Sequence, residues 1–263
     1  MRRAVVLATS AVIGLGVAAL VMGGDPFRTG SSRAENPLLV DGDFENNDAG
    51  QTLRAEEEPQ GWYESRRDSK EGRLQLKLSE KPIGDNATRK AMIKGSPELN
   101  TYLSQALEAP QDRPFDVQWD VYVKEIAPEA NRSCFQMLGD DSVKGKGPNA
   151  AGAERFVFLG FENAGSPGKM NLFAFEGGAN KDWSQKTVVV PNLDLEKWYT
   201  VGVAVDPKSK SYQVSVEGVT SAPVRVRAFE SKKGGVPKKL THVSFASWND
   251  GPGTFYVDNV KRR

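Results

Sequence analysis

The chain has 263 residues, and its 35 Lys and Arg residues nearly balance its 34 Asp and Glu residues, for a formal net charge of +1. This balance gives no indication of a nucleic-acid partner, which selects for an excess of basic residues. A chain of this length can bury a substantial core, and β-sandwich domains often reach 200 residues without dividing. We therefore expect a single large domain.

The N-terminus carries an export signal. Two arginines precede residues 4–22, an uncharged apolar run. Because this run is long for a signal peptide and close to the length that spans a bilayer, residues 1–23 are predicted to be either a cleaved signal peptide or an uncleaved membrane anchor. Residues 24–36 read as a linker and residues 37–263 as the folded domain. Both alternatives predict a domain that is secreted, periplasmic or at the cell surface.

Short runs with period-two alternation follow one another along the domain, and each predicts a β-strand. The runs are 73–79, 115–125, 155–162, 170–177, 186–193, 198–206, 211–218, 224–231, 240–248 and 254–262. The segment 96–110 fits a helix or a strand, and we predict a strand. Residues 206–211, "DPKSKS", are predicted to form a hairpin turn. The pattern as a whole predicts an all-β, antiparallel β-sandwich or jelly roll.

Two stretches resemble known families. "NPLLVDGDFENNDAG", which begins at Asn36, and the later "GWY" resemble the first strand of carbohydrate-binding modules with a galactose-binding-like fold. The segments 195–218 and 243–262 are similar to concanavalin A-like and laminin-G-like sandwich domains. Asp41 departs from the Asn that commonly opens the first motif. The resemblance implies two packed antiparallel sheets and a carbohydrate ligand.

The resemblance also implies a structural calcium ion between the acidic N-terminal motif and an aspartate near the last strand. The matching residues here are Asp41, Asp43, Glu45 and Asp258. Calcium takes six to eight oxygen ligands, and carboxylates with turn carbonyls supply them. The alternative is a turn whose acids face water, because Asp, Asn and Gly are turn formers. Both interpretations stay open at this point.

Two glycine-rich loops are predicted to contact a sugar. Aromatic rings stack on the apolar faces of sugars, and neighbouring polar side chains bind the hydroxyls. The candidate residues are Trp183 with Asn180 and Asp182, and Trp248 with Asn249 and Asp250. The alternative is that these two rings only pack or lie exposed. Trp62 and Trp119 are expected in the core, and Trp198 at the packed start of a strand.

The residues needed for familiar catalytic sites are scarce. His242 is the single histidine and lies in a predicted strand, which argues against nucleophilic triads and histidine-rich zinc sites. Cys134 is the single cysteine, so it has no partner for an internal disulfide. Asp120 and Glu125 are an odd number of residues apart, which puts them on opposite faces of a regular strand.

We therefore expect non-catalytic binding of a polysaccharide or other glycan by an exported β-sandwich. One alternative is a glycoside hydrolase or polysaccharide lyase of the same fold. A second is a structural surface domain that contacts protein.

Overall fold

The computed structural model describes residues 38–45, 61–64, 76–79, 81–140, 154–177, 185–227 and 236–263. Asn36–Arg263 is a compact unit of its own. In the described ranges, no helix has both the length and the apolar character needed to cross a membrane. The apolar run 4–22 and the linker lie outside those ranges, and the domain limits stay predictions.

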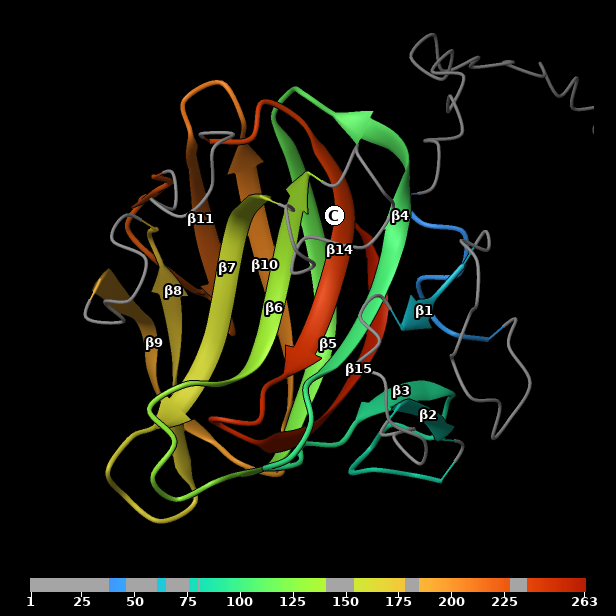
Figure 1. Ribbon diagram of the computed structural model, residues 1–263, viewed down its shortest axis with the longest axis vertical. Helices are drawn as coiled ribbons and strands as arrows, with labels where there is room; N and C mark the ends of the chain where they lie inside the picture. The colour runs from blue at the N-terminus through green and yellow to red at the C-terminus, as the bar shows by residue number, and fades with distance from the viewer. Residues whose placement is uncertain are drawn as a thin grey trace, which may run out of the picture. The chain divides into compact units, whose positions relative to one another are not determined.

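The domain consists of two antiparallel sheets (Figure 1). Sheet A has the order β1 (Tyr63–Glu64), β4 (Thr101–Gln111), β14 (Leu240–Ser247), β6 (Ser133–Asp140), β7 (Glu154–Asn163), β8 (Lys169–Phe175) and β9 (Lys186–Asp194). Sheet B has the order β12 (Val219–Thr220), β11 (Ser211–Val216), β10 (Trp198–Asp206), β5 (Phe115–Ile126), β15 (Gly253–Arg262), β3 (Lys90–Ile93) and β2 (Leu76–Ser79), with β13 (Val224–Arg225) also paired to β11. The predicted all-β sandwich is confirmed.

Most of the predicted strands are present with nearly the expected bounds. The ambiguous segment 96–110 contributes β4, a strand as predicted, and residues 206–211 form the turn between β10 and β11. The run 224–231 is shorter than expected, because only Val224–Arg225 pairs within its described part. Four strands lie outside the predicted runs: β3, β6 and the two-residue strands β1 and β12. β6 has no alternation to find, since seven of its eight residues are buried.

The core lies between the two sheets and follows from the alternation of the strands. On β5, Val117, Trp119 and Val121 point inward, and Val201 and Val203 do the same on β10. Burial of apolar surface stabilises such a core by about 25 cal/mol per Å². The Trp119 Nε1–H also donates a hydrogen bond to Gln136 Oε1 of sheet A, at 2.5 Å. Trp62 and Trp119 are buried, as expected.

The two sheets differ in how much of their outer faces is exposed. Every residue of β14 in sheet A is buried. A second apolar cluster lies on sheet A: Tyr102, Phe135, Met137, Phe158, Phe173, Phe175 and Ala246, with Trp248 packed against it. In contrast, alternate residues of β5, β10 and β11 in sheet B are half-buried or exposed. The outer face of sheet B is therefore the more accessible surface.

The N-terminal segment lies against the last strand. The Val260 N–H donates a hydrogen bond of 2.8 Å to the Gly42 carbonyl. A Cβ at Gly42 would lie 1.8 Å from the Val260 carbonyl oxygen, so this close approach requires glycine. Phe44 is fully buried and stacks on Trp62 with ring centroids 4.8 Å apart. These contacts hold residues 38–45 at the β15 side of sheet B.

Candidate functional site on the outer face of sheet B

An aromatic row crosses the outer face of sheet B. The strand register pairs Tyr122 of β5 with Trp198 of β10 on one side and with Tyr256 of β15 on the other. The ring centroids are 5.5 Å and 6.0 Å apart, respectively. Trp198 and Tyr122 are half-buried, whereas Tyr256 is buried. The row therefore offers part of its ring surface to solvent.

A row of polar residues lies two positions further along the same strands. Asp120 of β5 is paired with Thr200 of β10 and with Asp258 of β15. Asp120 Oδ1 accepts a hydrogen bond from the Thr200 hydroxyl at 2.6 Å, and its Oδ2 accepts one from the Asn259 side-chain amide at 2.9 Å. Asn259 has a φ of 52° where the β15 register shifts, and such a bulge redirects a side chain. The bulge thus fixes the orientation of the Asp120 carboxylate.

The loop 83–88 forms the rim of the site. The Trp198 Nε1–H donates a hydrogen bond of 2.6 Å to the Ile83 carbonyl. Gly84 has a φ of 58°, and a Cβ there would lie 3.2 Å from Trp198 Cδ1. The Asn86 side-chain amide donates a hydrogen bond of 2.7 Å to Asp258 Oδ2. Glycine is favoured at position 84 both for its backbone conformation and for the close packing on the indole.

Together these elements enclose an open depression of about 460 Å³, which we call the Trp198 depression. Its lining residues are Asp85, Asn86, Ala87, Thr88, Asp120, Trp198, Tyr199 and Thr200. The volume falls in the range of small-molecule sites. An indole beside carboxylate, amide and hydroxyl groups matches what a sugar requires, an apolar ring face together with hydrogen-bonding partners.

The buried carboxylate beside this site, that of Asp258, accepts its hydrogen bonds from the protein itself. Asp258 is 1% exposed. Its Oδ2 accepts hydrogen bonds from Asn86 and Thr88, and its Oδ1 accepts one from the Asn259 N–H. Burial raises the pKa of Asp258 above its ordinary value, and these hydrogen bonds oppose that effect. A carboxylate with this little exposure is poorly placed to protonate a bound sugar.

The residues predicted to bind calcium do not assemble as a set of free oxygen ligands. Asp41 is buried, whereas Asp43 and Glu45 are exposed. Glu45 Oε1 accepts a hydrogen bond of 2.8 Å from the Arg89 N–H. Among the described residues, no three His, Cys, Asp or Glu side chains are grouped so that they could hold a metal ion.

Lys90 lies in the same region and is fully buried. Its amino group donates hydrogen bonds to the carbonyl oxygens of Lys81, at 3.1 Å, and Thr88. Burial lowers the pKa of Lys90, while the charges of Asp258 and Glu45 raise it. Two carbonyl oxygens that would suit calcium thus bind a lysine amino group, and the charges of Asp258 and Glu45 act on the same group. In this arrangement the residues do not fit a calcium ion.

Of the residues predicted to contact a sugar, Trp248, Asn249 and Asp250 lie in the described part of the chain. Trp248 is half-buried and its ring centroid is 4.1 Å from that of Phe135. Asp250 forms an ion pair with Arg132. The three residues follow β14, and Trp248 packs against the second apolar cluster. Trp183, Asn180 and Asp182 lie outside the described residues.

The Trp198 depression is not among the predicted sites, because the sequence predicts Trp198 at the packed start of a strand. The alternation of β10 does contain the signal, since Trp198 and Thr200 are out of phase with the buried Val201, Val203 and Val205. The single histidine, His242, is buried in β14 with its Nδ1 2.9 Å from the Thr241 hydroxyl.

No family model matches the chain, and no curated protein matches it. Among solved structures, a sialidase aligns with 77% of this chain at 12% identity and a TM-score of 0.47, but the match covers only 16% of the sialidase chain. A carbohydrate esterase from Shiga toxin-encoding bacteriophage phi24B aligns with 77% of this chain and 89% of its own, at 12% identity and a TM-score of 0.49.

The carbohydrate recognition domain of Emp47p aligns with 86% of this chain and 96% of its own, at 12% identity and a TM-score of 0.47. With identities of 12% and TM-scores below 0.5, these similarities identify no function for this chain.

Proposed function

We propose that this domain binds a polysaccharide without cleaving it, and that the sugar occupies the Trp198 depression. The observation that carries the proposal is the half-buried Trp198 ring beside Asp120 and Thr200, in a depression of about 460 Å³. Stacking on the indole would hold a sugar ring, and the Asp120 carboxylate and the Thr200 hydroxyl would form hydrogen bonds with the hydroxyl groups of the sugar.

Binding is favoured over hydrolysis because Asp258, the carboxylate paired with Asp120, is buried and hydrogen-bonded within the protein. A glycosidase needs two carboxyl groups that flank the scissile bond. Asp120 and Asp258 lie on neighbouring strands, but Asp258 is buried and both its oxygens accept hydrogen bonds from the protein. A glycosidase or a lyase stays the alternative, and product analysis separates it from binding.

The test is a binding screen of the domain against soluble neutral and acidic polysaccharides, with parallel assays for reducing and unsaturated ends. Retarded migration in affinity electrophoresis without product release supports the proposal. Release of either product would establish an enzyme instead. Absence of binding to the whole panel would refute the proposal and favour the protein-contacting alternative.

Three tryptophan variants locate the site. Trp198→Ala is expected to weaken binding by about tenfold or more, because a large apolar contact is lost. Trp183→Ala and Trp248→Ala test the two loops predicted from the sequence. If Trp183→Ala or Trp248→Ala abolishes polysaccharide binding while Trp198→Ala binds as wild type does, the binding site lies in the loop of the affected residue. Val219→Thr, at a half-exposed position on β12, serves as the control.

We further propose that the domain is exported, with residues 1–23 as signal peptide or anchor. The proposal is supported by the basic start and the uncharged run that follows it. Mass spectrometry of the mature protein from a membrane and a soluble fraction distinguishes cleavage from retention. Recovery of the intact chain in the cytoplasm would contradict it.

A further inference from the structure

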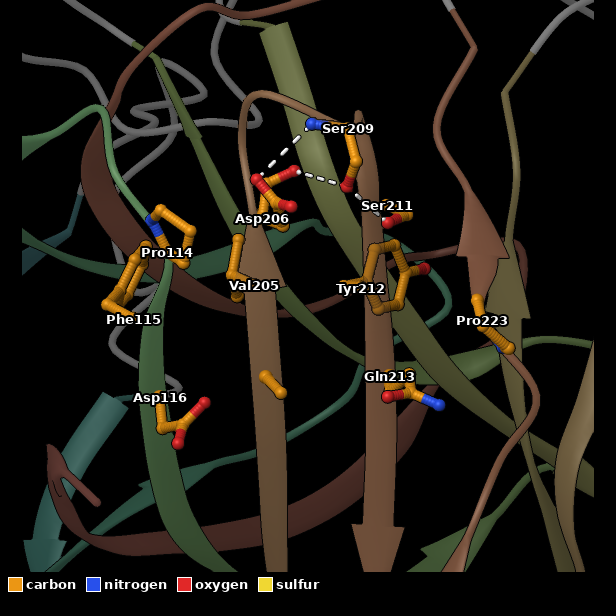
Figure 2. A pocket seen from close by; sticks show the side chains of 11 residues that line it. Pro114, Phe115, Asp116, Val205, Asp206, Ser209, Ser211, Tyr212, Gln213 and Pro223 are labelled. Atoms are coloured by element: carbon orange, nitrogen blue, oxygen red, sulfur yellow. Dashed lines mark hydrogen bonds between the residues drawn. The ribbon is translucent and has the colours of Figure 1, made fainter.

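A second depression lies on the same sheet, at the turn that joins β10 to β11 (Figure 2). Its volume is about 400 Å³. Figure 2 shows Asp116 on β5 and Gln213 on β11 on the two sides of β10. Asp206 and Ser209 close the end near the turn, where Asp206 Oδ1 accepts a hydrogen bond of 3.2 Å from the Ser209 N–H. We call this the Gln213 depression.

Both depressions lie along one strand. The Trp198 depression contains Trp198 and Thr200, and the Gln213 depression contains Ala204 and Asp206. These residues alternate with the buried valines of β10, so they share the outer face of sheet B. The two depressions are therefore aligned on β10, about 13 Å apart between Thr200 and Ala204 at the usual rise of a strand.

The residues of β10 between the depressions are small. Gly202 lies between Thr200 and Ala204 on the outer face, and its cross-strand partners are Gln118 of β5 and Ser215 of β11. Between the depressions, β10 therefore presents no outward side chain of its own.

Gly202 is buried, because the side chains of Ser215 and Arg263 lie over it between the two depressions. A Cβ there would lie 2.6 Å from Ser215 Oγ and 2.9 Å from Arg263 Nη1. The Arg263 guanidinium donates a hydrogen bond of 3.0 Å to Ser215 Oγ. Any larger residue at 202 would force these side chains to shift. A guanidinium at this point adds hydrogen-bond donors midway between the depressions.

We propose that one extended polysaccharide chain binds along β10 and occupies both depressions. This inference rests on the proposed function and names the form of its ligand. From Trp198 to Asp206 the strand spans about 27 Å, which exceeds the length of a single sugar ring and suits several linked ones. An end-on or single-sugar ligand would leave the Gln213 depression without a role.

The charges favour a neutral polysaccharide over a polyuronate. Asp85 and Asp120 line the Trp198 depression, and Asp116 and Asp206 line the Gln213 depression. A carboxylated polymer would meet like charges in both depressions, against the attraction of Arg263 between them and of Lys208 next to Asp206. Hydroxyl groups of a neutral sugar can instead donate hydrogen bonds to these carboxylates.

The test is calorimetric titration with neutral glucan oligosaccharides, from disaccharide to octasaccharide, of the linkage that binds best in the polysaccharide screen. Affinity is expected to rise with length until the oligosaccharide occupies both depressions. Gln213→Ala should lower the affinity for the octasaccharide about fivefold, which is the effect of one lost hydrogen bond. It should leave the affinity for the disaccharide unchanged. Trp198→Ala should weaken both. Thr220→Ala, on exposed β12, is the control, and urea unfolding checks that each variant is folded.

Two results would overturn this inference and leave the proposed function standing. One is an octasaccharide that binds no more tightly than the disaccharide while Trp198→Ala still weakens both. The other is an octasaccharide affinity that Gln213→Ala does not change. Tighter binding of polygalacturonate than of the neutral glucans would refute the neutral ligand. Failure of every oligosaccharide and polysaccharide to bind would overturn both the inference and the proposed function.

Discussion

Lys90 and Asp258 are buried side by side on the neighbouring strands β3 and β15. Ala91 and Val257 are paired across these strands, and Lys90 and Asp258 lie at the next position of the register. Each satisfies its hydrogen bonds elsewhere, Lys90 on two carbonyls and Asp258 on Asn86, Thr88 and Asn259. Because Asn86 also belongs to the Trp198 depression, this pair supports the rim of the candidate site.

Replacing Lys90 by methionine is expected to destabilise the domain. The substitution keeps most of the apolar stem but leaves the carbonyls of Lys81 and Thr88 without their donor and Asp258 without its neighbouring positive charge. We expect a loss of about 2 to 4 kcal/mol in the free energy of unfolding, measured by urea denaturation. Lys94→Met, at an exposed position just after β3, should change it by less than about 0.5 kcal/mol. Equal effects of the two substitutions would contradict this role of Lys90.

The stability of the folded domain is expected to be independent of divalent metal. Lys90 lies among the oxygens that a calcium ion would need, and Glu45 and Asp258 accept hydrogen bonds from protein groups. The midpoint of thermal unfolding should therefore be the same in a chelator and in millimolar calcium chloride. A calcium-dependent rise in the midpoint would instead support the calcium site that the resemblance implies for Asp41, Asp43, Glu45 and Asp258.

The Lys90 and Asp258 pKa shifts predict opposite pH dependences. Burial lowers the pKa of Lys90, so between that lowered value and 10.5 the unfolded chain binds more protons and stability rises with pH. Burial raises the pKa of Asp258, so above 3.8 the folded chain binds more protons and stability falls until the raised value is passed.

Urea unfolding over a pH series of wild type, Lys90→Met and Asp258→Asn measures both effects. The stability of wild type relative to Lys90→Met should rise toward pH 10.5, and relative to Asp258→Asn it should fall as the pH rises above 3.8. Parallel curves for all three proteins would show that neither group changes its pKa on folding.

β5 and β10 show how much of the fold the sequence could predict. Their alternation predicts two strands and separates inward valines from outward polar residues, as observed. Alternation carries no information on which strands become neighbours. Tyr122 and Trp198 meet only because β5 and β10 pair in a particular register. The candidate site depends on that register, and so do the burial of Lys90 and its proximity to Asp258.

β6 illustrates a different limit. Strands buried on both faces lose the period-two pattern on which the prediction relied, and β6 carries core residues on one side and second-cluster residues such as Phe135 on the other. The loop ring Trp248 belongs to the same cluster, so neighbouring Asn and Asp residues did not distinguish a binding loop from a packed one.

Cys134 is expected to be unreactive in the folded domain. Burial raises the pKa of its thiol to about 12, so almost no thiolate forms near neutral pH. A thiol reagent such as iodoacetamide should label it only after unfolding, and the labelling rate should follow the urea transition. Rapid labelling in native buffer at a rate unchanged by urea would contradict the buried position.

Gly84→Ala is expected to weaken polysaccharide binding, because Gly84 lies on the rim of the Trp198 depression and packs on the Trp198 ring. Gly84→Ala introduces a Cβ 3.2 Å from the Trp198 ring at a φ of 58°. The substitution should destabilise the domain by about 1 kcal/mol through its backbone alone, and should also weaken polysaccharide binding severalfold by displacing the indole.

Gly165→Ala is the matched control, because Gly165 also has a positive φ, of 79°, but a Cβ there would contact nothing within 4 Å. The control should share the loss of stability and keep wild-type affinity in the same electrophoretic assay. If both variants bind alike, the rim does not position Trp198. If Gly84→Ala alone loses affinity and also shifts the tryptophan fluorescence maximum, the loop acts on binding through the Trp198 ring.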